Sequence, residues 1–188
     1  MSVVALVLAA GRGTRFGSDK RRATLADGRS LLAHSVARAR AVFGDVRVVL
    51  RTGERAEDFG LADDCRVIVS PEAASGMGHS LAAGAGSLLD SPAQAVAILL
   101  GDMPWIASAT LQQLSEAAGV STIVLPRHAG QQGHPVLFGR DFWPALARLS
   151  GDEGARSVVQ AHRGCCVVVE VEDAGVLQDV DEPQGLSG

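Results

Sequence analysis

The sequence predicts an α/β fold: a single Rossmann-like domain with three α/β/α layers around a mostly parallel sheet. Short apolar runs of strand length alternate with segments of helical spacing almost throughout, which is typical of a parallel sheet covered on both faces. The 188 residues suit one hydrophobic core, and 47% apolar with 20% charged residues are ordinary globular values. No repeat, low-complexity stretch or long linker divides the chain, so residues 1–188 are expected to form one domain.

The first part of the chain predicts a strand, a helix and two more strands. Residues 3–8 form an apolar run that ends in glycines, as buried strands often do. Residues 30–42 have helical spacing, and the Ser30 hydroxyl can cap the helix N-terminus. Residues 46–50 are again apolar and strand-like. Residues 66–69 form a further strand, which a Ser-Pro pair ends.

The middle of the chain continues the alternation of helices and strands. Residues 78–89 have helical spacing and are rich in small side chains. Residues 95–100 form an apolar run that the sequence GDMP closes, so a strand is expected there. Residues 107–118 predict a helix. Residues 122–125 predict a strand that ends before a proline.

The last part predicts two strands and two helices. A short strand is expected at residues 135–138, followed by a helix at residues 141–149. A further helix is expected at residues 155–162. The chain then forms a long apolar run at residues 165–171, which predicts a final strand.

Composition excludes several classes of protein. The net charge of −4 argues against a nucleic-acid-binding surface. The apolar runs are too short to cross a bilayer, which takes about 20 residues, so no membrane partner is expected. No basic segment precedes the first apolar run, as it would in a secretory signal. We therefore expect a soluble cytoplasmic protein.

Three polar loops follow predicted strands at the carboxyl edge of the sheet, where open α/β folds bind ligands. They span residues 9–20, 70–78 and 101–104. The first loop includes the only lysine of the chain, against sixteen arginines, although the two cations are not interchangeable. The glycines and cations in and just after this loop are Gly11, Arg12, Gly13, Arg15, Gly17, Lys20, Arg21 and Arg22.

The first loop has the chemistry of a polyphosphate site, although it fits neither common template. Its glycines are spaced GxGxxxG rather than GxGxxG, and no Ser or Thr follows its lysine as in a Walker A loop. Glycines still let backbone N–H groups approach an anion closely. Arg15 can form forked hydrogen bonds to phosphate oxygens, and Lys20 can place a compact charge on them. A bound polyphosphate would balance this cluster of cations.

Six segments, in order, resemble one family. LAAGRGTRFGSDK resembles the LAAGxGxRxGxxK signature of MobA-like nucleotidyltransferases, which include the cytidylyl- and guanylyltransferases that mature the molybdenum cofactor. SGMGHSLAAG, LLGDMP, GHPVLF, SGDEGAR and DVDEP resemble later segments of the same family. The resemblance covers almost the full chain and implies the nucleotide-diphospho-sugar transferase-like variant of the predicted fold.

The resemblance also implies roles for individual residues. Arg15 and Lys20 would be catalytic and hold the triphosphate, and Asp102 and Asp181 would bind Mg²⁺, which prefers one or two carboxylates plus phosphates and water. His134 and Arg156 would bind the acceptor, although Arg156 could also be an ordinary arginine on a helix surface. For both His79 and His134, a catalytic role and an ordinary hydrogen bond or acceptor contact stay open. The implied nucleotide-binding residues are Leu8, Ala9, Ala10, Gly11, Gly13, Thr14, Ser75, Gly76 and Ser80.

The implied reaction transfers a nucleoside monophosphate from an NTP to a phosphorylated small-molecule acceptor and releases pyrophosphate. The AAG of the first loop favours CTP by analogy, and molybdopterin is the implied acceptor, with a molybdoenzyme as a further partner. One alternative is a sugar-phosphate or other small phospho-acceptor. Another is a chaperone that binds a nucleotide or the molybdenum cofactor without turnover.

One stretch departs from the family pattern. Relatives usually continue after the lysine with LLLPLxGxPLL, whereas this chain has RRATLADGRSLL. Arg21 and Arg22 therefore replace an apolar pair. Two readings stay open at this point: the arginines serve a more anionic acceptor, or they only add surface charge.

Overall fold

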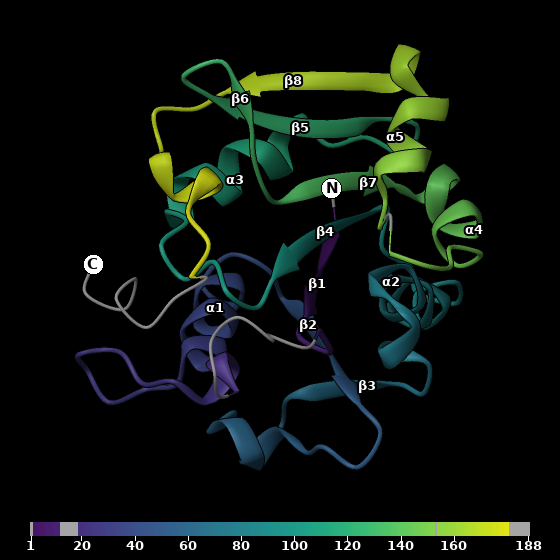
Figure 1. The fold of residues 1–188 in the computed structure, drawn as a ribbon. Coiled ribbons are helices and arrows are strands. Elements are labelled where there is room, and N and C mark those ends of the chain that lie inside the picture. The colour runs from purple at the N-terminus through teal and green to yellow at the C-terminus, as the bar shows by residue number, and fades with distance from the viewer. Residues whose placement is uncertain (1, 12–18, 153, 181–188) are drawn as a thin grey trace.

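One mixed sheet of eight strands organises the part of the chain that the structure, a computed structural model, describes: residues 2–11, 19–152 and 154–180. The strand order is β3-β2-β1-β4-β7-β5-β6, and β8 also pairs with β5 (Figure 1). Strands β3, β2, β1 and β4 run parallel, whereas β7 is antiparallel to β4 and β5. The strands are β1 Val3–Leu8, β2 Asp45–Arg51, β3 Arg66–Ser70, β4 Ala95–Leu100, β5 Ile123–His128, β6 Gln131–Gln132, β7 Val136–Gly139 and β8 Cys166–Glu170.

Alternation along β1 divides the interior into two cores, one on each face of the sheet. Ala5 and Val7 pack in one core, whereas Val4 and Leu6 pack in the other. All four residues are fully buried. Neither face of a strand that is covered on both sides contacts water, so all of its side chains are apolar and its sequence is a continuous apolar run.

Helices cover both faces and complete the predicted three layers (Figure 1). Buried residues of α1 and α3 belong to the core that contains Val7, and buried residues of α2, α4 and α5 belong to the core that contains Leu6. Ser30 caps α1 as predicted, because its hydroxyl accepts a 3.0 Å hydrogen bond from the Ala33 N–H. The helices are α1 Leu31–Arg40, α2 Met77–Gly86, α3 Ser108–Ala117, α4 Trp143–Leu146 and α5 Arg156–Ala161. Along the described ranges, none combines the length and apolar character that a membrane crossing requires.

The strand order places a ligand crevice between β1 and β4. From β1 the chain builds outward through β2 and β3, and then returns to the other side of β1 with β4. Helices α1 and α2, which follow β1 and β3, therefore lie on opposite faces of the sheet. Ligands of open α/β sheets bind at the carboxyl ends of the strands at such a reversal.

Several elements differ from the sequence prediction in their bounds. The helix expected at residues 141–149 is a 3₁₀ turn, Arg140–Phe142, followed by the single turn of α4. Pro144 has no N–H to donate to the Arg140 carbonyl, the bond that would make the preceding 3₁₀ turn part of an α-helix. Helix α2 ends at Gly86 rather than at residue 89, because the Ser87 hydroxyl donates to the Gly84 carbonyl at the helix end. The two-residue strand β6 was not predicted.

Candidate functional site

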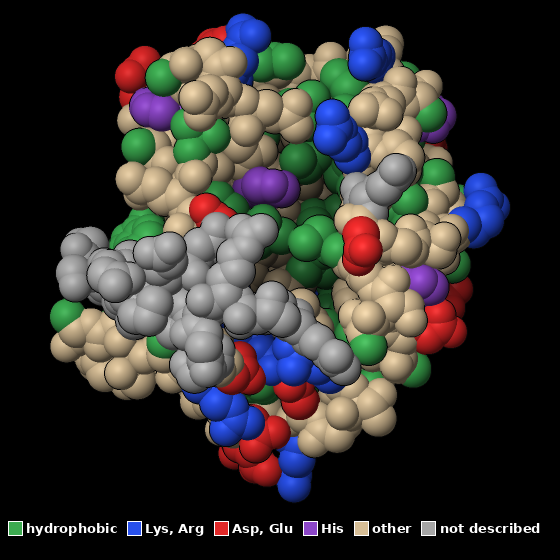
Figure 2. Space-filling view, in the orientation of Figure 1, with side chains coloured by type: hydrophobic (Ala, Val, Ile, Leu, Met, Phe, Trp, Pro, Cys, Tyr) green, Lys and Arg blue, Asp and Glu red, His purple; other side chains and the backbone are tan. Residues whose placement is uncertain are grey.

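A cavity of about 390 Å³ opens at the carboxyl ends of β1 and β4. A space-filling view of the molecule is hollowed near its centre, with hydrophobic side chains at the base of the hollow (Figure 2). The cavity brings together the three loops that the sequence analysis singled out, and a fourth segment that contains Asp152. Its lining residues are Leu8, Ala9, Ala10, Gly11, Lys20, Arg21, Ala73, Ala74, Gly76, Met77, Ser80, Leu100, Gly101, Asp102 and Asp152.

The floor of the cavity is the backbone that continues β1. The Ala9 N–H donates to the Val49 carbonyl at 3.0 Å, so the chain stays against the sheet beyond the last paired residue of the strand. Ala9 and Ala10 are buried, and their small side chains leave room above them. Among the described residues, no backbone acceptor takes a hydrogen bond from the N–H of Ala10 or Gly11. Ala10 is buried and Gly11 is exposed at the cavity lining. Buried N–H groups are nearly always paired, so the Ala10 donor suits a ligand oxygen, and the Gly11 donor beside it is open to the same ligand.

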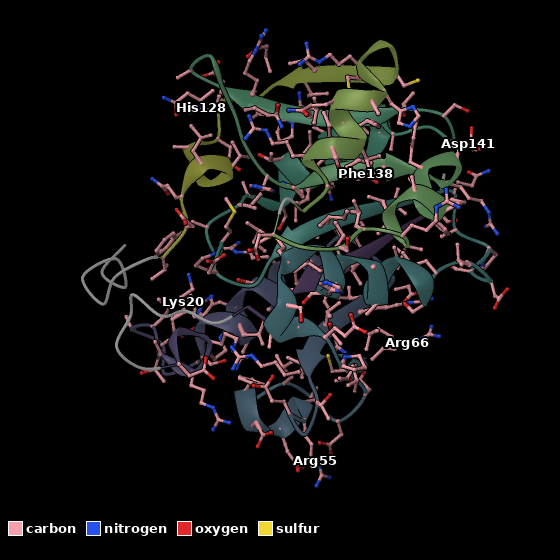
Figure 3. The ribbon with its side chains drawn as sticks, turned by 45° about the vertical axis from the view of Figure 1, so that its right-hand side comes forward. Lys20, Arg55, Arg66, His128, Phe138 and Asp141 are labelled. Atoms are coloured by element: carbon pink, nitrogen blue, oxygen red, sulfur yellow. The ribbon has the colours of Figure 1, made fainter. Side chains whose placement is uncertain are left out.

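Lys20 and Asp102 meet at the edge of this floor. The Lys20 Nζ lies 2.6 Å from the Asp102 Oδ2 and 3.1 Å from the Val180 carbonyl oxygen. The Val180 N–H in turn donates to the Asp102 carbonyl at 3.0 Å. The two side chains are only 17% and 20% exposed, so little water screens the pair. Lys20 is labelled in Figure 3.

Four of the predicted site residues lie outside the described residues: Gly13, Thr14, Arg15 and Asp181. Their roles stay predictions. Val180, the residue before Asp181, bonds to both Lys20 and the backbone of Asp102.

The N-terminus of α2 forms one wall of the cavity. Gly76, Met77 and Ser80 line it, whereas Ser75, in the 3₁₀ turn Ala73–Ser75, is not among the lining residues. Gly76 has a φ of +126°, which favours glycine. The Gly78 N–H donates to the Gly151 carbonyl at 2.7 Å, which holds the segment of Asp152 against the helix start.

We expect Gly76→Ala to destabilise the protein by about 1–3 kcal/mol, the usual cost of a residue held in an unfavourable backbone region. A Cβ at this position would lie 2.4 Å from the Gly151 carbonyl oxygen, so the wall would also have to shift. Denaturant unfolding measures the loss. Gly86→Ala is the matched control, because it lies at the other end of the same helix with nothing within 4 Å of its Cβ position. Equal stabilities of the two variants would contradict the expectation.

The predicted acceptor residues lie apart from the lining of the cavity. His134 is half-buried, and its Nδ1 is a buried ring nitrogen that has no hydrogen-bond partner among the residues that the structure describes. Burial lowers the pKa of His134 below its ordinary value, although the charges of Asp102 and Asp179 act in the opposite direction. Arg156 is an exposed residue at the start of α5. His79 has the ordinary partner that the sequence left open, since its Nδ1 lies 2.8 Å from Glu72.

Sequence reasoning missed the role of Arg21. Its side chain is buried rather than displayed to an acceptor or to solvent, with 5% of the residue exposed. It forms ion pairs of 2.6 Å with both Asp19 and Glu54, and its guanidinium stacks over the Phe59 ring. Only a search for distant carboxylate partners could have found this role, because the sequence around Arg21 shows a run of cations. Asp152 was missed as well, although it lies in the SGDEGAR segment.

The carboxylates that hold Arg21 are expected to make the fold acid-sensitive. Burial raises the pKa of Glu54 and of Asp19, but the hydrogen bonds and charge of Arg21 outweigh it and hold both pKa values below their ordinary range. A carboxylate whose pKa is lower in the folded state stabilises the fold at pH above its unfolded pKa. This contribution is lost as the pH falls from about 4.5 through the folded pKa.

Denaturant unfolding between pH 7 and pH 3 measures this acid sensitivity. Glu54→Gln should be less stable than the unmodified chain at pH 7 and should show a shallower loss toward pH 3, because one of the titrating partners is gone. Parallel stability curves for the two proteins would contradict the assignment.

The fold and the cavity define a domain of the nucleotide-diphospho-sugar transferase type. The sequence model of the MobA-like NTP transferase domain matches residues 5–165. The chain belongs to this family. The purine catabolism protein PucB of Bacillus subtilis (strain 168) is 32% identical over 117 residues, which are 62% of this chain and 57% of PucB. The bifunctional protein GlmU of Cereibacter sphaeroides (strain ATCC 17025 / ATH 2.4.3) is 33% identical over 171 residues, or 87% of this chain.

The matched regions cover only part of those curated relatives, with 37% for this GlmU. A solved structure matches over nearly its whole length. Rv0371c from Mycobacterium tuberculosis H37Rv superposes with a TM-score of 0.84 at 28% identity, covering 98% of this chain and 95% of that chain. A manganese complex of the same protein superposes with a TM-score of 0.76, covering 91% and 89%.

Proposed function

We propose that this protein transfers a nucleoside monophosphate from an NTP, with CTP favoured, to a phosphorylated acceptor, with molybdopterin favoured, and releases pyrophosphate. The observation that carries the proposal is the meeting of Lys20 and Asp102 beside the amides of Ala10 and Gly11, which no backbone acceptor of the described residues pairs, in one cavity at the β1/β4 reversal. The proposal includes a molybdoenzyme as recipient of the product. Membership in the MobA-like family supports the reaction class.

The cavity has separate surfaces for the parts of a nucleotide. Leu8, Ala9 and Ala10 offer a small apolar floor that suits the base and sugar. Lys20 and the amides of Ala10 and Gly11 would hold the triphosphate, with Gly13, Thr14 and Arg15 as proposed further contacts. Gly76 and Ser80 face the cavity beside the N-terminus of α2, where a helix favours negative charge, and Ser75 is proposed with them.

The donor set fits a magnesium ion shared with substrate. The Asp102 carboxylate lines the cavity and carries the negative charge that a metal ion needs, and its partner among the described residues is the Lys20 ammonium at 2.6 Å. Within the described ranges, no group of three or more His, Cys, Asp or Glu side chains could hold a metal unaided. Mg²⁺ needs no such group, because it binds through one or two carboxylates together with phosphates and water. Asp102 would therefore hold it, with Asp181 as the proposed second ligand, and the manganese complex of Rv0371c is consistent with a divalent ion.

The reaction needs charge compensation more than covalent chemistry from the protein. An acceptor phosphate oxygen forms a bond to the α-phosphorus, and the bond from that phosphorus to the bridging oxygen breaks, so pyrophosphate leaves with its electron pair. Both reactants are anionic and repel each other. Bound magnesium would supply part of the neutralising charge. Lys20 and Arg15 would supply the rest and hold the phosphates in line, which is most of what phosphoryl-type transfers require.

The acceptor would enter on the side of His134 and Arg156. Burial lowers the pKa of His134, which favours the neutral ring, and a neutral ring nitrogen can donate or accept a hydrogen bond without adding charge. Arg156 is exposed and can reach an anionic group.

Pyrophosphate release tests the proposal. The protein is incubated with Mg²⁺, each of the four NTPs, and either molybdopterin or a panel of sugar phosphates. We expect release with CTP and molybdopterin. Release with sugar phosphates alone would favour the alternative acceptor. Thermal stabilisation by an NTP, about 2.7 kcal/mol at a hundredfold excess over Kd, without any release would favour a chaperone.

A further inference from the structure

A network of four charged residues, of which one is buried and three are partly exposed, joins the two ends of the first loop. It consists of Asp19, Arg21, Arg51 and Glu54, and we call it the arginine clamp. Arg51 is the last residue of β2, and Glu54 follows in the next turn. Asp19 and Arg21 belong to the other end of the loop, where Asp19 accepts hydrogen bonds from the Arg21 Nε and Nη2 at 2.8 and 2.6 Å. The clamp therefore connects β2 to the 3₁₀ turn Lys20–Arg22.

Glu54 is the centre of the arginine clamp. Its Oε1 and Oε2 accept hydrogen bonds from the Arg21 Nη2 and Nη1 at 2.6 and 2.8 Å, a bidentate pair. It also accepts a hydrogen bond from the Arg51 backbone N–H at 3.0 Å. Bidentate pairs of this kind fix geometry as well as adding energy. The remaining Arg21 donor bonds to the Ala9 carbonyl at 2.6 Å, so all five of its N–H groups are used.

The two arginines hold three successive carbonyl groups of the loop. Arg21 donates to the Ala9 carbonyl, and Arg51 donates to the Ala10 carbonyl from its Nε at 2.9 Å and to the Gly11 carbonyl from its Nη2. In a trans peptide the N–H of the next residue points opposite to the carbonyl. Fixing the Ala9 and Ala10 carbonyls therefore fixes the direction of the N–H groups of Ala10 and Gly11, the two donors of the cavity floor that have no backbone acceptor within the described part of the chain.

The arginine clamp also fixes the backbone on both sides of Lys20. Asp19 and Arg21 flank Lys20 in sequence, and the Asp19 side chain caps the 3₁₀ turn that carries it. Arg21 is buried, so its charge is directed at Asp19 and Glu54 and not at solvent. We propose that Arg21 and Glu54 are positioning residues for nucleotidyl transfer, which orient the loop amides and the Lys20 ammonium toward the triphosphate. This inference rests on the proposed function, because it names the residues that prepare the same site.

Binding of inorganic tripolyphosphate, the part shared by all NTPs, tests the arginine clamp without needing the acceptor. Titration calorimetry compares the unmodified chain with Arg21→Met and Glu54→Gln. We expect both variants to bind tripolyphosphate at least about tenfold more weakly, because losing one well-directed hydrogen bond to a charged phosphate oxygen costs about tenfold or more in affinity. Arg47→Met is the matched control. Arg47 is also buried on β2 and paired with an aspartate, Asp45, but it bonds to the Ser87 carbonyl and not to the loop.

Turnover supplies a readout that a loss of stability alone would not move. We expect Arg21→Met to lower kcat, and Lys20→Ala to cost much less in the Arg21→Met background than in the unmodified chain, because Lys20 is already misplaced there. Costs that add independently would overturn the proposal, as would unchanged tripolyphosphate affinity in folded Glu54→Gln, a variant that keeps the volume of the side chain. If Arg21→Met fails to fold, the tripolyphosphate affinity of Glu54→Gln alone tests the proposal.

The same measurements distinguish a failure of the arginine clamp proposal from a failure of the proposed function. If the unmodified chain binds tripolyphosphate but releases no pyrophosphate with any acceptor, the proposed function is wrong. The tripolyphosphate affinities of the variants still test whether the arginine clamp positions the site. If the unmodified chain does not bind tripolyphosphate, the arginine clamp is overturned as well.

Discussion

Replacing Lys20 with alanine is expected to lower the turnover number by about a hundredfold to a thousandfold, or roughly 2.7–4 kcal/mol of activation free energy. The ammonium lies 2.6 Å from Asp102 at the edge of the cavity, where a transferred phosphoryl group would gain charge. Preorganised cations of this kind act mainly in the transition state, so kcat should fall more than KM rises. Steady-state kinetics of pyrophosphate release measures both constants.

Arg55→Ala is the control for this prediction. Arg55 is a strongly exposed cation paired with Glu57, and it lies far below Lys20 in Figure 3. Its removal should leave turnover unchanged, because exposed ion pairs contribute little. Lys20→Arg should recover only part of the activity, since a guanidinium cannot replace a compact ammonium at this position. Full activity of Lys20→Ala would show that the lysine has no catalytic role.

Asp102→Asn is expected to lower turnover at least about a hundredfold, with a higher concentration of Mg²⁺ needed for half-maximal rate. The amide keeps the shape of the side chain but removes the charge that favours a cation. It also leaves the Lys20 ammonium with a weaker partner, although the Val180 carbonyl remains at 3.1 Å. Magnesium titration of the pyrophosphate-release rate separates the loss of metal affinity from the loss of maximal rate.

Asp141→Asn removes a carboxylate from another part of the molecule. Asp141 is exposed and accepts a hydrogen bond from the Ser121 hydroxyl, well away from Lys20 in Figure 3. For the Asp141→Asn variant, the dependence of the pyrophosphate-release rate on Mg²⁺ concentration should match that of the unmodified chain. An Asp102→Asn variant with the same magnesium dependence would exclude Asp102 as the metal ligand.

Much of the site could be predicted because it depends on strand ends. The apolar run of β1 stops at glycines, and that of β4 stops at Gly101 and Asp102, so both loops had to begin at the same edge of a parallel sheet. That topology brings the loop of Lys20 and the loop of Asp102 to the same edge, whereas the direct ion pair of the two side chains, 82 positions apart, was not predicted. The capping of α1 by Ser30 is likewise a local rule of the sequence.

Other features depend on partners that no local pattern reveals. Arg21 lies in a run of cations, and charged residues are rarely buried unless paired, so its burial requires Asp19 and Glu54 together. Glu54 lies 33 positions away, in a turn whose only sequence signal is its polarity. The antiparallel direction of β7 could not be predicted from a local pattern either. A short buried strand has the same apolar sequence whichever way it runs.

A crystal of the protein with CTP and Mn²⁺ tests the central claim most directly, because the anomalous signal of manganese locates the metal independently of the rest of the density. We predict one manganese ion bonded to a carboxylate oxygen of Asp102 and to phosphate oxygens of CTP, with the triphosphate contacting Lys20 and the amides of Ala10 and Gly11. A triphosphate bound away from these amides, or manganese bonded to CTP without Asp102, would contradict the account.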